Sequence, residues 1–317
     1  MRVLLCLAAL LLAAPAFADR PDQFEAAEKA MEARDFAGAA SILRPLADDG
    51  DAEAQYRLGM ALADGRQYGA MGGVEGVDWL ERAALQGHEN AVLRLAYGHQ
   101  HWTNHPFHRA ELVRWLEYGV EAGFPWAMSW LAGYLHTDTG LYTRQDHERA
   151  RALYQAAADA GHGHAMVPLA QMLMAGEGGP ADGASALAWL EAARAAEIRF
   201  TEWPTGELFH YGAPGVESDL DQAAYWYMQA ARQGLQPPSA WSRLSDLYEA
   251  RGDRARAASA LDVFLNRLSD PHRPELHAYM AGLRERQAMY HTDLTEAERE
   301  TRQRVTLACL YNDGVCD

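Results

Sequence analysis

The sequence predicts an all-α fold, a right-handed α-solenoid of about eight antiparallel helix pairs. Two recurring patterns lead to this prediction. In the first, an Ala and a Leu stand four residues apart. In the second, a bulky apolar residue is followed four or five residues later by small ones. Residues at this spacing lie on the same face of a helix, so both patterns predict helices with one apolar face.

The first pattern begins at Ala54 and Leu58. Its other copies, at first 37, 36 and 38 residues apart, are Ala91 with Leu95, Ala127 with Leu131, Ala165 with Leu169, and Ala240 with Leu244. Between the last two copies, the pattern has Pro204 and Leu208. Because proline disfavours a helix interior, we expect that helix to start late and residues 198–211 to include an exposed aromatic loop.

The second pattern alternates with the first. Its segments end at Gly87, Gly123, Gly161, Glu197 and Gly234, and eight residues before these ends stand Trp79, Trp115, Leu153, Trp189 and Trp226. Glycine at a helix end favours a left-handed C-cap. One helix pair cannot bury its own apolar face, whereas stacked pairs can, which is why the periodicity predicts a solenoid.

The repeats resemble the Sel-one-like repeat family, relatives of the tetratricopeptide repeats. The best copies are "AEAQYRLGMALADGRQYGAMGGVEGVDWLERAALQG" and "GELFHYGAPGVESDLDQAAYWYMQAARQG". The resemblance covers residues 51–235. It implies a scaffold or adaptor that binds a protein or peptide in a concave groove, and exported members often act in envelope signalling, secretion or surface polysaccharide regulation.

The two ends differ from the central repeats. Residues 19–50 predict a helix pair closer to an ordinary tetratricopeptide. Residues 236–317 predict a second such pair, followed by polar capping helices. Thr295 should cap the last helix, and Glu298 should complete a capping box.

The first eighteen residues, "MRVLLCLAALLLAAPAFA", predict a secretory signal peptide at residues 1–18. An arginine precedes an apolar run, which ends in a small-residue cleavage site at Ala18. The run is too short to favour a membrane span, and no other stretch is long and apolar enough to be one. We therefore expect a periplasmic or secreted protein.

The formal net charge of −16 makes nucleic acid and anionic membrane surfaces poor partners. Cys309 and Cys316 remain after removal of the signal peptide. In an oxidising compartment we expect them to form a disulfide that closes the C-terminal tail, and two unpaired thiols are the alternative.

The sequence contains no recognisable catalytic motif, so we expect a non-catalytic protein without a cofactor. The alternative is an enzyme that binds or hydrolyses cell-wall-like or β-lactam ligands, as described for cysteine-rich members of the family. Those members carry a cysteine pair in nearly every repeat, whereas this chain has no cysteine from Leu7 to Ala308.

A histidine-rich stretch, "GHQHWTNHPFH", lies where the repeat predicts a loop. Its four histidines are candidate metal ligands, since their spacings occur among zinc ligands: His99, His101, His105 and His108. A metal-binding periplasmic protein is thus a further alternative. The competing interpretation is that these imidazoles cap helix ends and line a solvated loop.

Aromatic residues outside the second pattern are the candidates for partner binding. Trp126 and Trp130 share a helix face at positions that are polar in the two preceding copies, and Trp102 lies nearby in sequence. Arg57 and Arg94 hold one repeat position and predict a basic stripe for an acidic peptide. The alternatives are internal packing for the tryptophans and pairing with nearby acids for the arginines.

Overall fold

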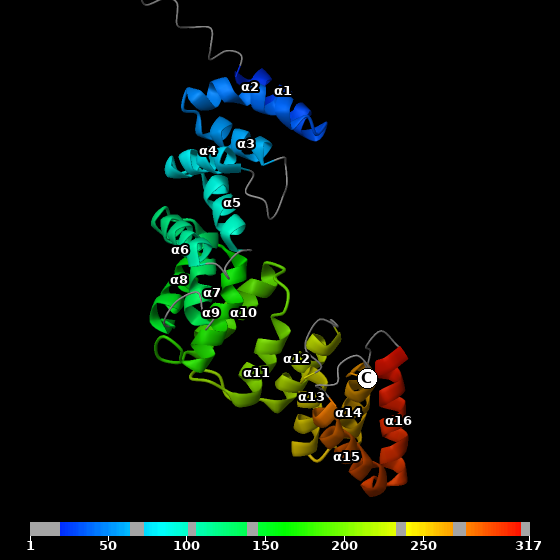
Figure 1. The fold of residues 1–317 in the computed structure, drawn as a ribbon. Helices are drawn as coiled ribbons and strands as arrows, with labels where there is room; N and C mark the ends of the chain where they lie inside the picture. The colour runs from blue at the N-terminus through cyan, green and yellow to red at the C-terminus, as the bar shows by residue number, and fades with distance from the viewer. Residues whose placement is uncertain are drawn as a thin grey trace, which may run out of the picture. The chain divides into compact units, whose positions relative to one another are not determined.

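The computed structural model describes residues 20–63, 73–100, 106–137, 145–232, 239–268 and 277–311 of the chain. These ranges contain sixteen α-helices and no β-strand, with a single isolated bridge between Ala213 and Val216 (Figure 1). The predicted all-α fold of about eight helix pairs is confirmed. Residues 1–19 lie outside the described ranges, so the signal peptide stays a prediction.

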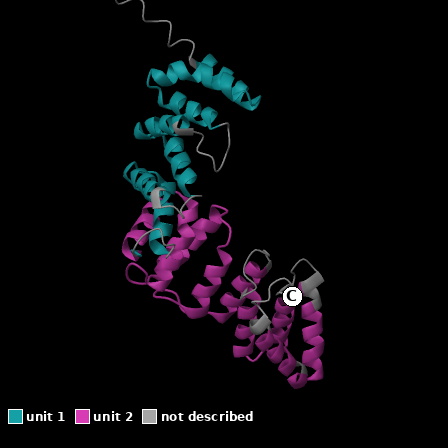
Figure 2. Ribbon diagram, in the orientation of Figure 1, with its two compact units in different colours: residues 1–146 teal, residues 147–317 magenta. Residues whose placement is uncertain are grey.

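The helices fall into two compact units, residues 1–146 and 147–317 (Figure 2). The first unit contains α1 (Arg20–Glu32), α2 (Phe36–Asp48), α3 (Ala52–Leu62), α4 (Gly73–Leu85), α5 (Glu89–Gln100), α6 (Pro106–Glu121) and α7 (Pro125–His136). Each helix packs on the next one along the chain, which is the arrangement expected of stacked helix pairs.

The second unit contains α8 (His147–Asp159), α9 (Gly163–Ala175), α10 (Gly183–Ala195), α11 (Glu202–Tyr211), α12 (Leu220–Arg232), α13 (Ser239–Ala250), α14 (Arg254–Leu268), α15 (His277–Asp293) and α16 (Glu296–Tyr311). Consecutive helices from α8 to α15 pack here as well, and α14 packs against both α15 and α16.

The Ala and Leu of the first pattern form the centre of the core. All ten residues of the five complete copies are at most 1% exposed. Leu208, in the copy that carries Pro204, is also fully buried. The repeat position inferred from the sequence is therefore the one at which each first helix contacts its neighbours.

The bulky residue of the second pattern stands one residue before the position that is buried in every copy. Trp79 and Trp115 are buried, but Leu153, Trp189 and Trp226 are only half-buried. The residue after each of these five is buried in every copy: Leu80, Leu116, Tyr154, Leu190 and Tyr227. A step of one residue turns a helix by about 100°, which places Leu153, Trp189 and Trp226 at the edge of the core.

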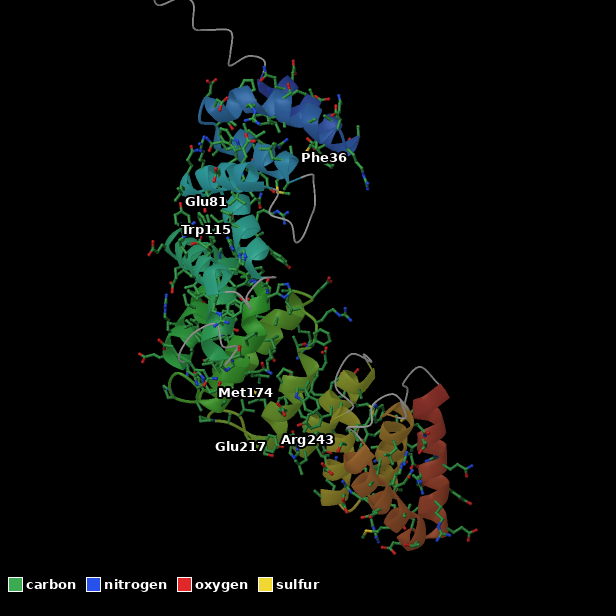
Figure 3. The ribbon with its side chains drawn as sticks, in the orientation of Figure 1. Phe36, Glu81, Trp115, Met174, Glu217 and Arg243 are labelled. Carbon is green, nitrogen blue, oxygen red and sulfur yellow. The ribbon has the colours of Figure 1, made fainter. Side chains whose placement is uncertain are left out.

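Arginine side chains cover several indoles of this pattern. The guanidinium of Arg114 lies 4.4 Å from the ring centre of Trp115 on α6, and that of Arg194 lies 4.1 Å from Trp226. Arg114 also donates a 2.8 Å hydrogen bond to Glu81 on α4. Figure 3 labels Glu81 and Trp115 on these two helices. The cation–π contact of Arg194 thus connects α10 to α12, whereas Arg114 covers an indole of its own helix and connects α6 to α4 through Glu81.

Residues with a left-handed backbone conformation follow the second helices of the repeats, as expected. Gly87, Gly123 and Gly161 have φ angles of 83°, 83° and 84°. Glu197, which takes the glycine place in its copy, has φ 57°, so a side chain occupies a backbone conformation that glycine adopts without strain.

The expectation that the helix with Pro204 starts late is wrong. Helix α11 begins at Glu202, two residues before Pro204, and α3, α5, α7 and α9 each begin two residues before their pattern Ala. Pro204 lies in the first turn, where backbone N–H groups have no acceptor within the helix, so the proline removes no helix hydrogen bond. The preceding loop does expose an aromatic ring, because Phe200 is 39% exposed.

Hydrogen bonds and a buried ion pair fix the last helix, α16. The backbone N–H of Thr295 donates to Glu298 at 2.7 Å, and that of Glu298 donates to the Thr295 hydroxyl at 3.4 Å, so the predicted capping box is confirmed. On α14, Asp262 accepts two hydrogen bonds from Arg302 of α16, at 2.6 and 2.7 Å. Both side chains are 10% exposed, so this pair ties α16 to α14 in a nearly water-free setting.

Candidate partner-binding surface

The first helices of successive repeats carry comparable positions beside their buried pattern residues. The residue directly before the pattern Leu is half-buried in the copies that have Arg57, Arg94 and Trp130. The residue four positions earlier lies one helical turn away on the same side. These positions are where one repeat can differ from the next without disturbing the core.

In the first unit, this side of α5 and α7 is aromatic. The rings of Trp126 and Trp130 on α7 lie 5.6 Å apart in an edge-to-face arrangement. Trp130 contacts Tyr97 of α5 at 5.1 Å between ring centres, and Phe124 stacks on Trp126 at 6.3 Å. All four rings are half-buried. We call Tyr97, Phe124, Trp126 and Trp130 the aromatic surface.

The two tryptophans pack against each other and also keep exposed area, since both rings are half-buried. The indole nitrogen of Trp126 is covered by protein and has no hydrogen-bond acceptor among the described residues. Burying such a donor without an acceptor is unfavourable, which indicates an apolar setting on that edge. Trp102 lies outside the described residues.

Sequence reasoning missed Tyr97 as a member of this surface. It stands three residues after Arg94 and two after the pattern residue Leu95. Residues three apart lie on one side of a helix, so a search of that stripe on each first helix would have found it.

The arginine stripe does not present a free positive charge at Arg57. Its Nε donates a hydrogen bond to Glu53, and a second nitrogen lies 3.8 Å from Glu28. The guanidinium also lies 5.1 Å from the ring centre of Phe24. Pairing with nearby acids, the alternative interpretation, thus describes Arg57. Arg94 is half-buried, and its positive charge acts on Tyr56.

Two of the four candidate metal ligands, His99 and His108, lie in contact with each other. The Nδ1 atoms of His99 and His108 are 3.0 Å apart, a hydrogen-bonding distance, and His99 is 2% exposed. Burial, followed by the charges of His108 and Arg114, lowers the pKa of His99 to about 4. Within the described ranges, no three His, Cys, Asp or Glu side chains gather as a metal site would require. His101 and His105 lie outside those ranges, so the four-histidine metal site stays a prediction.

The second unit holds a polar and aromatic cluster that the sequence did not reveal. Nδ1 of His210 on α11 lies 3.2 Å from the hydroxyl of Tyr227 on α12, and Trp203 contacts the Tyr227 ring at 5.1 Å. A Cβ added to Gly206 would lie 2.6 Å from this ring, so glycine there lets Tyr227 approach the backbone of α11. Burial raises the pKa of Glu207, although Arg243 and Trp203 partly offset this effect. The cluster joins α11 to α12.

Cys309 is buried, whereas Cys316 lies outside the described residues. The predicted disulfide between them therefore stays a prediction. Among the described residues, none of the helices combines the length and apolarity that crossing a membrane requires.

Comparison with models of known families identifies the type of repeat. The model described as Sel1 repeat matches residues 52–88, 127–162, 163–196 and 205–235, which cover α3–α4 and α7–α12. The chain belongs to the Sel1 repeat family. The α5–α6 pair lies between the first two matched repeats and carries the same buried residues, Ala91, Leu95 and Trp115. Sel1 repeats generally mediate protein interactions, and proteins built from them are generally non-catalytic scaffolds.

Solved structures of Sel1 repeat proteins resemble this chain. A protective antigen of uropathogenic Escherichia coli with an SLR fold matches with a TM-score of 0.58 and 20% identity over 84% of this chain. The match covers 55% of the antigen, so this chain spans about half of that protein's length. At this identity the likeness shows the fold alone.

Two further structures match with lower TM-scores. A Sel1 repeat protein from Oxalobacter formigenes matches at 26% identity with a TM-score of 0.45, covering 63% of this chain and 78% of that one. A Sel1 repeat protein from Klebsiella pneumoniae matches at 22% identity with a TM-score of 0.36, covering 66% and 98%. The comparison with curated proteins found no match.

Proposed function

We propose that this Sel1 repeat protein is an exported, non-catalytic scaffold that binds a protein or peptide partner through the aromatic surface of its first unit. The observation that carries the proposal is the contact of Trp126 and Trp130 with each other and with Tyr97 while all three rings remain half-buried. Large rings that keep exposed area and have little freedom to move are typical of the anchors of protein interfaces.

The repeat register supports this assignment. Where α7 has Trp126 and Trp130, α3 has Glu53 and Arg57. The core of the repeat is complete without these indoles, because Ala127 and Leu131 beside them are fully buried. Aromatic residues placed outside a completed core are therefore explained better by a contact with another molecule than by the fold.

Export is the second part of the proposal and rests on the sequence of residues 1–18. The expected product starts at Asp19 and resides in the periplasm or outside the cell, where envelope signalling or secretion would supply partners. The intact mass of the protein purified from its own host tests this part, since a mass that includes residues 1–18 would contradict it.

Capture from envelope extract tests the partner-binding surface. Tagged wild-type protein is compared with a Trp126→Ala/Trp130→Ala variant and with a matched control, Trp189→Ala, a half-buried indole of the second unit. We expect partners that the wild type and the control retain and the double variant loses. When binding to such a partner is measured directly, the affinity of the double variant should be at least tenfold lower than that of the wild type. Partners retained by the double variant with unchanged affinity would exclude the aromatic surface. Circular dichroism must show that all three proteins are folded.

A further inference from the structure

A small apolar pocket opens on the first unit, away from the aromatic surface. It has a volume of about 230 Å³ and lies between α1, α2 and α3. Leu43 of α2 and Ala27 of α1, 0% and 1% exposed, belong to the core beneath it. Half-buried Met31 and Met60 line it from α1 and α3, together with Tyr56. Pockets for small-molecule ligands usually measure about 300–1,000 Å³, so this volume suits one large apolar side chain better.

The walls of the pocket are adaptable. Methionine is unbranched and polarisable and packs against many shapes, so Met31 and Met60 allow apolar side chains of different outline to enter. The rigid base of Leu43 and Ala27 limits the depth. A pocket of this kind suits an anchor residue of a peptide, which buries one side chain and leaves its backbone at the rim.

The rim carries the carboxylate of Glu28 and the guanidinium of Arg57, and a second carboxylate, that of Glu53, pairs with Arg57 beside the pocket. Glu28 lies 3.8 Å from Arg57, and Arg57 donates a hydrogen bond to Glu53. The second oxygen of Glu53 lies 2.8 Å from Nε2 of His88. Burial would raise the pKa of Glu53, but hydrogen bonds from His88 and Arg57 lower it below the ordinary value, so this carboxylate keeps its charge. Among Glu28, Glu53 and Arg57, the negative charges therefore outnumber the positive one.

The helix beside the pocket adds to this charge. Besides Glu28, helix α1 contains three acids, Asp22, Glu25 and Glu32, against two basic residues, Arg20 and Lys29. Lys29 is already paired with Glu25 at 2.6 Å. Together with the net charge of −16 on the chain, this gives the pocket surroundings that attract cations. The basic stripe expected at Arg57 thus becomes, in the folded protein, part of an acidic rim.

We propose that this pocket binds a basic segment of a partner protein, in which one Leu, Met or Phe enters the pocket and flanking Lys or Arg side chains meet Glu28 and α1. The site is distinct from the aromatic surface. It reverses the charge expected of the peptide from the sequence, because the arginine at the rim is already neutralised.

Three fluorescein-labelled twelve-residue peptides test the proposal by fluorescence anisotropy with the full chain. The first has six lysines around a single central Phe, the second has Gly in place of the Phe, and the third has Glu in place of every Lys. We expect the first to bind at least tenfold more tightly than either of the others, and its affinity to fall as salt is added. Equal binding of the Gly peptide, or of the Glu peptide, would overturn the proposal.

Variants connect the binding to the pocket. Ala27→Leu fills the cavity, and we expect it to weaken the binding of the Phe peptide at least tenfold. Glu28→Lys reverses a charge at the rim, and we expect it to weaken that binding about fivefold. Met31→Gln, a polar side chain of similar length, replaces Ala27→Leu if that variant does not fold. The matched control is Glu121→Lys, an exposed acid at the end of α6, which should change the affinity less than twofold. Unchanged binding in the pocket variants would refute the site.

Two further outcomes are decisive. A wild-type dimer in sedimentation experiments that Ala27→Leu converts to a monomer would assign the pocket to a second copy of the chain and overturn the basic-peptide proposal. The Trp126→Ala/Trp130→Ala variant should bind the Phe peptide as the wild type does. The pocket and the aromatic surface can therefore fail independently of each other.

Discussion

At the scale of single residues, the repeat register locates strain that composition alone would not reveal. Glu197 adopts φ 57°, whereas the equivalent residues in three sister repeats are glycines with φ near 83°. For an L-residue with a side chain, the left-handed region costs roughly 1–2 kcal/mol. The sequence predicted the exception, because Glu197 stands in the glycine place, but only the backbone shows that it keeps the glycine conformation.

Glu197→Gly should therefore stabilise the second unit. We expect a gain of about 1 kcal/mol after allowance for the greater freedom of glycine in the unfolded chain, which corresponds to a melting temperature higher by roughly 2–4 °C. Thermal unfolding followed by circular dichroism measures this, and the reverse change at a sister position, Gly161→Ala, should lower the melting temperature. A Glu197→Gly protein that melts below the wild type would contradict the strain argument.

A second residue-scale prediction concerns His99. Its pKa is about 4 in the folded protein against 6.5 in the unfolded chain. Protonation therefore favours unfolding: the contribution of neutral His99 to stability is fully present above pH 6.5 and is lost as the pH falls from 6.5 towards 4. At pH 5 the loss amounts to roughly 2 kcal/mol.

Urea unfolding at pH 7.5 and pH 5, with EDTA present, tests this prediction. His99→Gln removes the titrating group and keeps a polar side chain beside His108. The wild type should lose roughly 2 kcal/mol more than this variant between the two pH values. Parallel losses in the two proteins would show that His99 titrates alike in the folded and unfolded states.

At the scale of helices, the sequence predicted which elements exist better than which side chains hold them together. The helix pairs, the capping box at Thr295 and the left-handed ends follow from local rules. Leu80 and its counterparts are buried in every copy, whereas the residue before them is buried only at Trp79 and Trp115, and this difference depends on how each helix rotates against the next. The predicted late start of α11 is wrong because the first turn of a helix tolerates proline, whose missing N–H would have no acceptor within the helix there.

The ion pair between Asp262 and Arg302 is a helix-scale feature that required the structure, because forty residues separate the two side chains. Asp262→Ala leaves the guanidinium of Arg302 buried without its carboxylate, which costs roughly 3–5 kcal/mol. We expect a melting temperature lower by about 10 °C and faster hydrogen exchange in α16. Breaking an exposed pair with Glu25→Gln should leave the melting temperature unchanged. An Asp262→Ala protein with wild-type melting would show that α16 does not depend on this pair.

At the scale of the whole chain, the period of the repeat was sufficient to predict an all-α fold and family membership. It recovered the α5–α6 pair in addition to the four matched repeats. The candidate surfaces were only partly predictable. Trp126 and Trp130 stood out because their sister positions are polar, but Tyr97 joins them through packing between two helices. The pocket beside Arg57 combines three helices, and its charge depends on pairings that the linear pattern does not contain.

The exposed face of α16 affects how copies of this chain can meet. A stack of identical helix pairs presents an unsatisfied face at its last member, and such a face invites another molecule to continue the stack into a filament. Helix α16 turns its buried residues, Arg302 and Val305, towards α14 and exposes charged ones, Glu296, Arg299, Glu300 and Arg304. Packing of another copy against this face would have to strip water from those charges, so we expect the exposed face of α16 to disfavour head-to-tail growth.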